Sequence, residues 1–572
     1  MRTSILVYRS ALIAALGGLL FGFDTAVISG TIGSLKKEFF LNDWWLGFTV
    51  ASALIGTVLG AATAQIPSNR LGRKPTLIVI AAIYFISAVG TTCFWNLGAQ
   101  TTVDWWFFVF FRFIGGIAVG ASSVVSPLYT AEISPAKKRG LLVAFTQFNI
   151  VFGILVAFFT NYLIALVHSE SMAGSAYSNV LGAYIASGME WRWMLGIEAM
   201  PAALFFFLLF TVPESPRWQI GRGHTDKAKA TLQKLGTDEG RTVEEEVNVI
   251  QVAIEEETRN AREAFFTPRL WFPIMLAICM AAFNQLSGIN AVLYYAPTIF
   301  SMTGVSTETA FFFPVIIGFA NLVFTMGAMA IIDSFGRKKL MIVGSIGYIT
   351  GLAVVAMAFW IYAPQFKVSI ANLDVQSAQK KVEQTQSALD MAPDDTKEFW
   401  QSELQNALSK YVAAVIDKAV IEAQTEDKNA ISATEWEELL TQNFEEIKTK
   451  VESRIDLTAT VPMAGILTIL IGLMVFIASH AVGQGACIWV FIGEIFPQRV
   501  RAQGQALGCS VHWILCTAIS FLFPPLLAIL GPTNIFFMFS GFMVLQLIWV
   551  LTLMPETKQV QLEEMQRRLG IK

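Results

Sequence analysis

The chain has 572 residues, of which 54% are hydrophobic and only 15% are charged, whereas an ordinary soluble domain carries roughly 25% charged residues. The net charge of −3 does not indicate a nucleic-acid partner. The five cysteines are widely spaced within apolar stretches, so they indicate neither a disulfide framework nor a metal site. The composition therefore argues against a soluble domain and predicts helices that face lipid.

The first apolar stretch follows Arg2 and Arg9 and so imitates a signal peptide, but no small-residue cleavage pattern comes after it. Because many more apolar stretches follow, we expect a retained transmembrane helix. A span needs about 20 mostly apolar residues, and this criterion predicts twelve spans, arranged as six, a polar stretch and six. The predicted spans are 7–30, 44–67, 75–95, 104–130, 141–167, 191–212, 270–301, 309–332, 339–363, 461–491, 503–530 and 534–554.

A short basic turn occurs once in each half, between two long apolar stretches. The copies read Asn69-Arg70-Leu71-Gly72-Arg73-Lys74 and Asp333-Ser334-Phe335-Gly336-Arg337-Lys338. Duplicated bundles are typical of secondary transporters. The sequence thus predicts an all-α integral membrane protein built from two pseudo-symmetric six-helix bundles.

Lysine and arginine gather in the short loops on one side of the predicted bundles. The positive-inside rule makes this side cytoplasmic, together with both termini, and we expect a multi-pass protein of the cell (inner) membrane. The basic residues of these loops are Arg70, Arg73, Lys74, Lys137, Lys138, Arg139, Arg337, Lys338, Lys339, Arg499 and Arg501.

Two polar stretches interrupt the spans. The cytoplasmic one contains short amphipathic helices over 225–235 and 242–264. The outer one has apolar residues at helical spacing, from Leu404 to Val415, which predicts separate helices or a helical hairpin. It is either a partner-binding domain or a solvated cap, and its charge favours the cap. The predicted regions are 1–212 (first bundle), 213–269 (linker), 270–363 (spans seven to nine), 364–460 (outer insertion), 461–555 (spans ten to twelve) and 556–572 (cytoplasmic tail).

Three ionisable residues lie within predicted spans, where a charge is costly and therefore suggests function. Asp24, Arg112 and Glu198 are each roughly six to eight residues from the outer end of a span, about 9–12 Å deep. Arg112 would keep Asp24 ionised, and separation would let Asp24 take a proton. The alternative is a static ion network, although buried ion pairs are weak evidence for stability alone.

Neutral polar and aromatic residues also occur at membrane depth. Amides donate and accept hydrogen bonds, which suits sugar hydroxyls, and indole faces cover the C–H face of a sugar ring. The alternative is hydrogen bonding between helices, which is also the commoner role of a lone histidine such as His512. Ser287 and Gly288 are expected to loosen span seven. The set comprises Gln147, Asn284, Gln285, Asn290, Tyr294, Asn321, Trp489, His512 and Trp513.

Glutamates precede arginines by seven residues at matching span ends, namely Glu132 before Arg139 and Glu494 before Arg501. With the two basic turns they can form ion pairs that hold the inner ends of the halves together when the site faces outward. Anchoring by the positive-inside rule explains the basic residues but not the paired glutamates. The sequence therefore predicts a cytoplasmic gate of Arg70, Gly72, Arg73, Glu132, Arg139, Asp333, Gly336, Arg337, Glu494 and Arg501.

Several longer motifs occur besides the basic turns. They are Gly17-Gly18-Leu19-Leu20-Phe21-Gly22-Phe23-Asp24, Arg112-Phe113-Ile114-Gly115-Gly116, Pro213-Glu214-Ser215-Pro216-Arg217-Trp218, Gln285-Leu286-Ser287-Gly288-Ile289-Asn290, Gly493-Glu494-Ile495-Phe496-Pro497 and Pro555-Glu556-Thr557. On these motifs the chain resembles the sugar porter family of the major facilitator superfamily, over nearly its whole length apart from 364–460.

The resemblance implies alternating access between two six-helix halves with a monosaccharide at the centre. It implies sugar ligands at Gln147, Gln285, Asn290, Tyr294, Asn321, Trp489 and Trp513, and a hydrophobic wall at Phe21. Proton-coupled members carry an acid at the position of Asp24, whereas passive glucose facilitators lack acids there and at the position of Glu198. The chain is therefore most similar to bacterial proton-coupled xylose and other monosaccharide symporters.

Three departures from the family pattern stand out. Asn284 replaces the usual Gln and is one methylene shorter, which puts a direct sugar contact there in doubt. His512 replaces Gln or Asn, and we expect it to alter hydroxyl preference. The Gly483-Gln484-Gly485 run lacks the proline of many relatives, and the family gives no role for the outer insertion.

The sequence thus predicts proton-coupled import of a pentose or hexose, with sugar, protons and lipid as partners and no cofactor. One rival is a passive facilitator of the same fold, and another is a transport-inactive sugar sensor, which only the outer insertion encourages. An enzyme is least favoured, because the chain has no zinc motif, nucleophile elbow or phosphate-binding loop.

Overall fold

The computed structural model describes residues 5–93, 101–172, 190–237, 241–260, 265–390, 392–393, 396–426, 462–497, 499–558, 560 and 562–571. Eleven helical stretches in this part of the chain are long and apolar enough to cross a membrane. The last of them joins two helices at Gly531, where φ is 74°. The described helices therefore provide twelve spans, as predicted.

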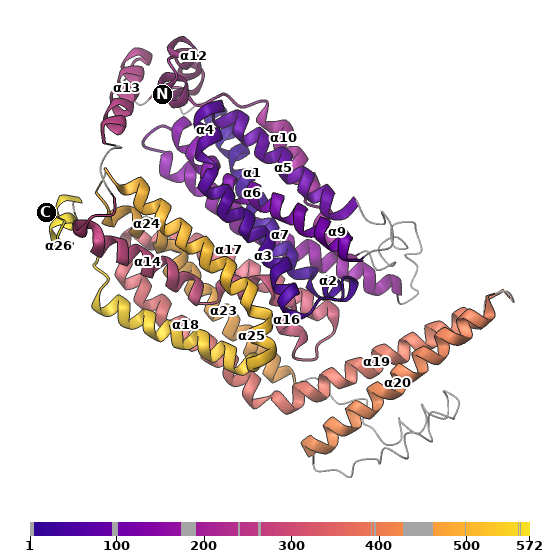
Figure 1. Ribbon diagram of the computed structural model, residues 1–572. Helices are drawn as coiled ribbons and strands as arrows, with labels where there is room; N and C mark the ends of the chain where they lie inside the picture. The colour runs from indigo at the N-terminus through magenta and orange to yellow at the C-terminus, as the bar shows by residue number, and fades with distance from the viewer. Residues whose placement is uncertain are drawn as a thin grey trace.

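The first half contains six spans, and a short helix follows the first of them on the side away from the basic turns (Figure 1). Span six is divided in two. The elements are α1 (Ile5–Val27), η1 (Ile28–Gly30), α2 (Ile32–Glu38), α3 (Asp43–Thr63), α4 (Gln65–Leu71), α5 (Arg73–Cys93), α6 (Thr101–Ile133), α7 (Arg139–Met172), α9 (Glu190–Gly196) and α10 (Ala199–Leu209).

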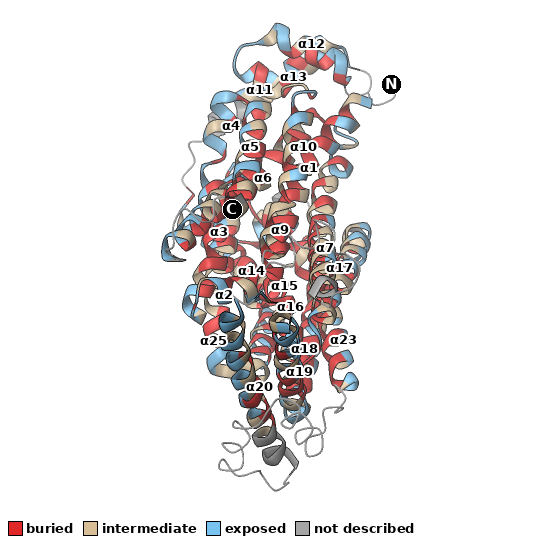
Figure 2. Ribbon diagram, turned by 90° about the vertical axis from the view of Figure 1, so that its right-hand side faces the viewer, coloured by how far each residue is buried: buried red, intermediate tan, exposed pale blue. Residues whose placement is uncertain are grey.

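Three short helices link the halves on the side of the basic turns, which we call the basic side. They are α11 (Pro216–Gly221), α12 (Thr225–Leu235) and α13 (Val243–Asn260). The two predicted amphipathic helices are thus present. Their apolar faces pack on each other through residues such as Leu232 and Val247, while their other faces are exposed (Figure 2).

The second half repeats the six-span pattern, but two of its spans are broken. Span seven turns at Gly288, and span ten contains a five-residue π-helix. The elements are η2 (Pro268–Leu270), α14 (Trp271–Leu286), α15 (Ile289–Tyr294), α16 (Ala296–Ser301), α17 (Thr307–Phe335), α18 (Arg337–Ile361), α23 (Met463–His480), η3 (Ala481–Gly485), α24 (Ala486–Ile495), α25 (Arg501–Thr552) and α26 (Leu562–Arg568).

The described part of the outer insertion is a helical hairpin of α19 (Ala363–Asp390) and α20 (Lys397–Glu426). A small core of Val375, Val382, Tyr411, Val412 and Val415 joins the two helices. The hairpin extends from the second half on the side opposite the basic turns (Figure 1). The rest of the predicted insertion, 427–460, lies outside the described residues.

The two halves share a core on one side only. Away from the basic turns, a single hydrophobic cluster includes residues of both halves, such as Phe108, Ile154, Ile317 and Phe536. On the basic side, the core of the first half and the core of the second half are separate clusters. The hydrophobic cores of the two halves are therefore joined away from the basic turns and separate on the basic side.

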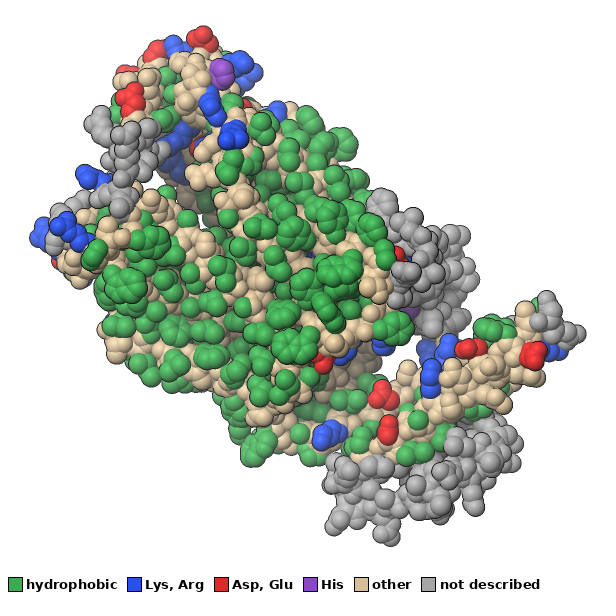
Figure 3. All heavy atoms as spheres, viewed as in Figure 1, with side chains coloured by type: hydrophobic (Ala, Val, Ile, Leu, Met, Phe, Trp, Pro, Cys, Tyr) green, Lys and Arg blue, Asp and Glu red, His purple; other side chains and the backbone are tan. Residues whose placement is uncertain are grey.

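The surface fits a membrane protein. Apolar side chains cover the flanks of both halves, and charged side chains gather at the linker helices and on the hairpin (Figure 3). Exposed residues of the flanks include Phe207, Phe319, Val343 and Ile471. An apolar band between two charged ends is the arrangement that a lipid bilayer requires.

Candidate functional site

The charged residues of the spans meet inside the first half. Asp24 of α1 and Arg112 of α6 are only 6% and 3% exposed, and their side chains form an ion pair. The long helices carry both residues to the same depth, as the sequence predicted. The Arg112 Nε atom has no hydrogen-bond partner in the described structure, so the guanidinium retains a free donor.

Glu198 lies at the break in span six. Pro201 has no N–H to donate to the carbonyl of Ile197, so the helix opens between α9 and α10 and Glu198 becomes the first residue before α10. The carboxyl is buried and interacts electrostatically with both Asp24 and Arg112. Its Oε1 atom has no hydrogen-bond partner among the described residues. A second buried carboxyl therefore lies near the Asp24–Arg112 pair without bonding to it in this structure.

A small cavity of about 10 Å³ lies beside this charged group. Asp24 and Arg112 line it from the first half, and Tyr294 and Trp513 line it from the second half. Its volume is at the lower limit for one water molecule. The cavity places the acid next to two of the predicted sugar ligands.

A hydrogen-bonded polar cluster lies in the second half. Gln285 donates through Nε2 to Asn284 Oδ1 at 2.8 Å and accepts from Asn290 Nδ2 at 2.8 Å. The same Nε2 lies 3.2 Å from His512 Nδ1, and Asn290 Nδ2 also lies 3.1 Å from Cys516 Sγ. The turn at Gly288 brings Asn290 back toward Gln285. Asn284 thus holds Gln285 in place in this structure.

Aromatic rings flank the polar cluster and connect it to the first half. His512 lies with its ring centroid 5.4 Å from Trp489 and 5.1 Å from Trp513. Trp513 in turn contacts Phe21 of α1, with centroids 5.6 Å apart. These contacts place an apolar, ring-lined wall beside a set of amides, which is the chemistry that a sugar ring needs.

Three predicted ligands stand apart from this bonded cluster. Asn321 of α17 is buried and accepts a hydrogen bond from Thr325 Oγ1 at 3.3 Å. Gln147 of α7 is half-buried, and Tyr294 of α15 is buried beside the small cavity. None of the three bonds to Gln285 or Asn290 in the described structure.

Sequence reasoning missed a second polar chain in the second half. Tyr348 of α18 bonds to His480 and Gln484 of span ten, and Gln484 bonds to Gln546 of span twelve. The signal was present, because polar residues in an apolar span are unusual. Sequence reasoning gave His480 and Gln546 no role, because their contacts with Tyr348 and Gln484 are made between different spans.

The basic side shows the same arrangement twice. In the first half, Arg73 donates to Glu132 through Nε and Nη2 at 2.8 and 2.9 Å. In the second half, Arg337 Nη2 donates to Glu494 Oε1 at 2.9 Å. Gly72 and Gly336 begin these turns with φ of 112° and 91°, a conformation that favours glycine. The predicted duplication is therefore present in the bonding as well as in the sequence.

The Pro-Glu-Ser and Pro-Glu-Thr motifs bind the two basic turns through their glutamates. Glu214 accepts hydrogen bonds from the backbone N–H groups of Arg73 and Lys74, and Glu556 accepts from those of Arg337 and Lys338. Burial raises the pKa of the Glu214 carboxyl, and the backbone hydrogen bonds lower it in part. A carboxylate therefore caps the helix that follows each basic turn.

Neither of these two ion pairs connects the two halves. The pairing between the inner ends of the halves, which is expected when the site faces outward, therefore stays a prediction. Arg139 Nε donates to the backbone of Ala131 at 3.1 Å, and Arg501 Nε has no partner in the described structure. Arg70 is exposed, and the Asp333 side chain lies outside the described residues.

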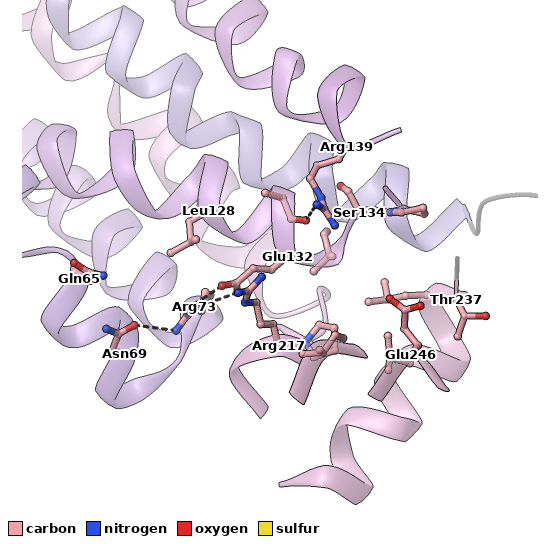
Figure 4. Close-up of a pocket in the computed structure, with 18 residues that line it drawn as sticks. Gln65, Asn69, Arg73, Leu128, Glu132, Ser134, Arg139, Arg217, Thr237 and Glu246 are labelled. Carbon is pink, nitrogen blue, oxygen red and sulfur yellow. Dashed lines mark hydrogen bonds and ion pairs between the residues drawn. The ribbon is translucent and has the colours of Figure 1, made fainter. Parts of the chain in front are cut away.

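A cavity of about 460 Å³ on the basic side lies between the first half and the linker helices (Figure 4). Figure 4 shows the bond between Arg73 and Glu132 and, apart from it, Arg139 bonded to the backbone. The cavity is lined by gate residues on one side and by Thr237 and Glu246 on the other. All of its lining residues thus belong to the first half or to the linker.

The family model described as "Sugar (and other) transporter" matches residues 10–373 and 453–569. The chain belongs to this sugar transporter family. The unmatched segment, 374–452, falls within the outer insertion. The family contains transporters and not enzymes, so the enzyme reading is set aside.

Two curated relatives illustrate how similar this sugar transporter is to characterised proteins. It is 39% identical over 378 residues to the D-xylose-proton symporter of Escherichia coli K12, which covers 63% of this chain and 73% of the symporter. It is 30% identical over 559 residues to the glucose transport protein of Synechocystis, which covers 97% of this chain and 95% of that protein.

Solved structures of the E. coli xylose transporter share the fold. The partially occluded inward-open conformation has a TM-score of 0.68 at 29% identity, covering 98% of this chain and 100% of that chain. The proton:xylose symporter bound to 6-bromo-6-deoxy-D-glucose has a TM-score of 0.63 at 29% identity, covering 99% of each chain. The major facilitator fold predicted from the sequence is therefore confirmed.

Proposed function

We propose that this sugar transporter imports a xylose-like pentose or a hexose together with protons, by alternating access. The observation that carries the proposal is that Asp24 and Glu198 are both buried in the first half, where Arg112 forms an ion pair with Asp24 and Glu198 forms none among the described residues. If all three groups are ionised, one negative charge lies uncompensated away from water. Such a charge costs several kcal/mol, on the order of the effective penalty for one buried ion. A bound proton removes this cost.

The same arrangement explains how Asp24 can bind and release a proton. When Asp24 is protonated, its hold on Arg112 weakens, and the guanidinium still has Glu198 as a partner. When the proton leaves, Arg112 returns to Asp24. Arg112 is therefore never left without a carboxylate, which keeps the charged group stable in both protonation states.

The sugar is expected to bind mainly to the second half, at the Gln285 cluster and the tryptophans around it. The small cavity lined by Asp24, Arg112, Tyr294 and Trp513 supports a link between the proton and the sugar. A sugar that moves Tyr294 or Trp513 changes the surroundings of the acid. Proton-coupled transport by the E. coli relative agrees with this proposal.

The basic side is proposed to face the cytoplasm, with both termini, in the cell (inner) membrane. The separate cores on that side and the likeness to an inward-open structure support an inward-facing stage of the cycle. When the halves close on that side, Arg139 and Arg501 are expected to pair with Glu494 and Glu132 of the opposite half. That pairing would form the cytoplasmic gate.

Proton movement driven by sugar tests the proposal. Purified protein is reconstituted in vesicles, and xylose is added outside while the external pH is recorded. The wild type should make the medium more alkaline as sugar enters. The Asp24→Asn variant should lose both this signal and accumulation against a gradient, yet retain exchange of labelled for unlabelled sugar.

Asp43→Asn is the matched control, because Asp43 pairs with Lys36 at the outer surface and lies outside the charged group. It should behave like the wild type. Sugar entry by the wild type without any proton signal would make the protein a passive facilitator. Accumulation retained by Asp24→Asn would remove Asp24 from the coupling role.

A further inference from the structure

His480 is a membrane-depth histidine to which the proposed cycle gives no role. It is the last residue of α23 and directly precedes the π-helix Ala481–Gly485. Its Nδ1 atom lies 2.6 Å from the Tyr348 hydroxyl. Its Nε2 atom has no hydrogen-bond partner among the described residues. π-Helical turns occur frequently at functional sites.

A chain of hydrogen bonds, in which each donor is fixed by the bond before it, ends at this histidine. Ser345 Oγ donates to the Met341 carbonyl at 2.7 Å, and Gln546 Nε2 donates to Ser345 Oγ at 2.8 Å. Gln484 Nε2 donates to Gln546 Oε1. Gln484 therefore has only its Oε1 left to face Tyr348, and Tyr348 donates to it at 3.3 Å.

The direction of the chain fixes the protonation of the imidazole. Because the Tyr348 proton is given to Gln484, the Tyr348 oxygen is left to accept from His480. His480 must then carry its proton on Nδ1, so Nε2 is a bare acceptor. Tyr348, Gln484, Gln546 and Ser345 are fully buried, so water does not compete with these bonds.

The bare nitrogen lies next to the proposed sugar ligands. His480 Nε2 sits over Gly485, where an added Cβ would be 3.5 Å from it. Gly485 is one helical turn before Trp489. Trp489 in turn contacts the ring of His512, whose Nδ1 faces Gln285.

The chain is held rigidly, because spans nine and ten meet by their backbones. A Cβ on Gly344 would lie 2.8 Å from the Gly483 Cα atom. This close approach brings Tyr348 within reach of both His480 and Gln484. The position of the acceptor is therefore set by packing and by bonds, as a site that selects among hydroxyls requires.

We propose that His480 is a specificity-determining residue that accepts a hydrogen bond from one hydroxyl of the sugar through Nε2, and that Tyr348 positions it by fixing its tautomer. The proposal rests on monosaccharide binding, which is one part of the proposed function. It does not depend on proton coupling.

The test is a binding panel of xylose and of its analogues that each lack one hydroxyl group. In the wild type, loss of the hydroxyl that faces His480 should weaken binding about 3- to 10-fold. In His480→Phe, the analogue that lacks this hydroxyl should bind as tightly as xylose binds to the same variant. The analogues that lack any other hydroxyl should still bind more weakly than xylose. Tyr348→Phe should reduce the same penalty, since the tautomer is no longer fixed.

Two controls separate this role from a structural one. Tyr295→Phe removes a buried hydroxyl that bonds to the Ser520 backbone, and Thr468→Val alters an exposed hydroxyl on α23. Both should keep the wild-type pattern of penalties. The ¹⁵N signals of the His480 imidazole should show a protonated Nδ1 in the wild type and a mixture in Tyr348→Phe.

The inference is overturned if His480→Phe leaves every penalty unchanged or if the imidazole of the wild type carries its proton on Nε2. Binding of xylose without proton movement would overturn proton coupling alone, and the His480 panel would still be decisive.

Discussion

The two halves have the same topology but divide the chemistry between them. The spans of the first half are closely packed and contain the buried charges Asp24, Arg112 and Glu198. The second half has broken spans at Gly288 and at the π-helix of span ten, and its buried polar groups are mostly neutral amides and hydroxyls. Duplication therefore supplied two similar scaffolds, and the first is suited to a proton and the second to a sugar.

The difference follows from what each ligand requires. A proton needs only a buried charge balance, which side chains of neighbouring spans can provide when they lie at the same depth. A sugar needs several directed hydrogen bonds, and a broken helix can turn side chains of one span toward a common centre. The broken spans of the second half carry Gln285, Asn290 and Trp489 in this way.

The sharpest test of this division is Gln285→Leu. It removes the central amide of the cluster, leaves the Asn284 side chain without its partner and leaves Asn290 Nδ2 with only Cys516 Sγ in the described structure. Loss of one buried hydrogen-bonding partner costs about 1–3 kcal/mol, so the affinity for sugar should fall about 10- to 100-fold. The number of protons moved per sugar should not change. Isothermal titration and flux ratios in vesicles measure the two quantities.

Gln386→Leu, on the exposed surface of the hairpin, is the matched control and should bind sugar normally. A change in the proton-to-sugar ratio of Gln285→Leu would show that the second half also carries the coupling, and the division between halves would fail.

Gly22→Ala tests the close packing of the first half. A Cβ at Gly22 would lie 1.8 Å from the Ile150 carbonyl oxygen, so α1 and α7 must move apart. Overpacking typically costs about 1–3 kcal/mol, and the thermal midpoint in detergent should fall. Gly541→Ala in the second half has no atom within 4 Å of the new Cβ and should leave the midpoint unchanged or slightly raised. Equal midpoints for both variants would contradict this packing.

Glu198→Gln has a smaller expected effect. The substitution removes the second carboxylate, so Arg112 has only Asp24 as a charged partner and holds it more firmly in the ionised state. Proton-coupled uptake should slow several-fold and require a more acidic medium, while sugar exchange proceeds at the wild-type rate. Uptake measured against external pH shows the shift, and an unchanged pH profile would assign Glu198 a structural role only.

The smallest effect is expected in the hairpin. Burial, followed by the neighbouring Asp417, raises the pKa of Asp374, and Lys37 lowers it in part. A carboxyl whose pKa is raised by folding favours the folded state at low pH, and this contribution is lost as pH rises through the raised pKa. Asp374→Asn should therefore reduce the acid stabilisation of the hairpin. Hydrogen exchange of α19 at pH 4 and pH 7 measures it, and equal pH dependence in both proteins would refute the assignment.

Much of the fold follows from the sequence because span length, basic loops and apolar spacing are local properties. The twelve spans, the linker helices and the hairpin helices are present where these patterns predicted them. The meeting of Asp24 with Arg112 followed from their equal depth. The contacts of the Gln285 cluster agree with the polar pattern of span seven.

Other features depend on packing between distant segments. The π-helix of span ten is joined to Tyr348 and Gln546, which are far away in the sequence. The ion pairs of the basic side depend on which conformation the halves adopt, so Glu132 and Glu494 pair within their own halves in this structure. Spacing alone contains neither kind of information.

Protonation of Asp24 is the central claim, and infrared difference spectroscopy with isotope-labelled aspartate tests it most directly. Spectra of the purified protein are recorded over a range of pH, with and without xylose. The account predicts a protonated aspartate signal that changes on sugar binding and that is absent from Asp24→Asn. An Asp24 that stays ionised at every pH, with and without sugar, would contradict proton coupling through this residue.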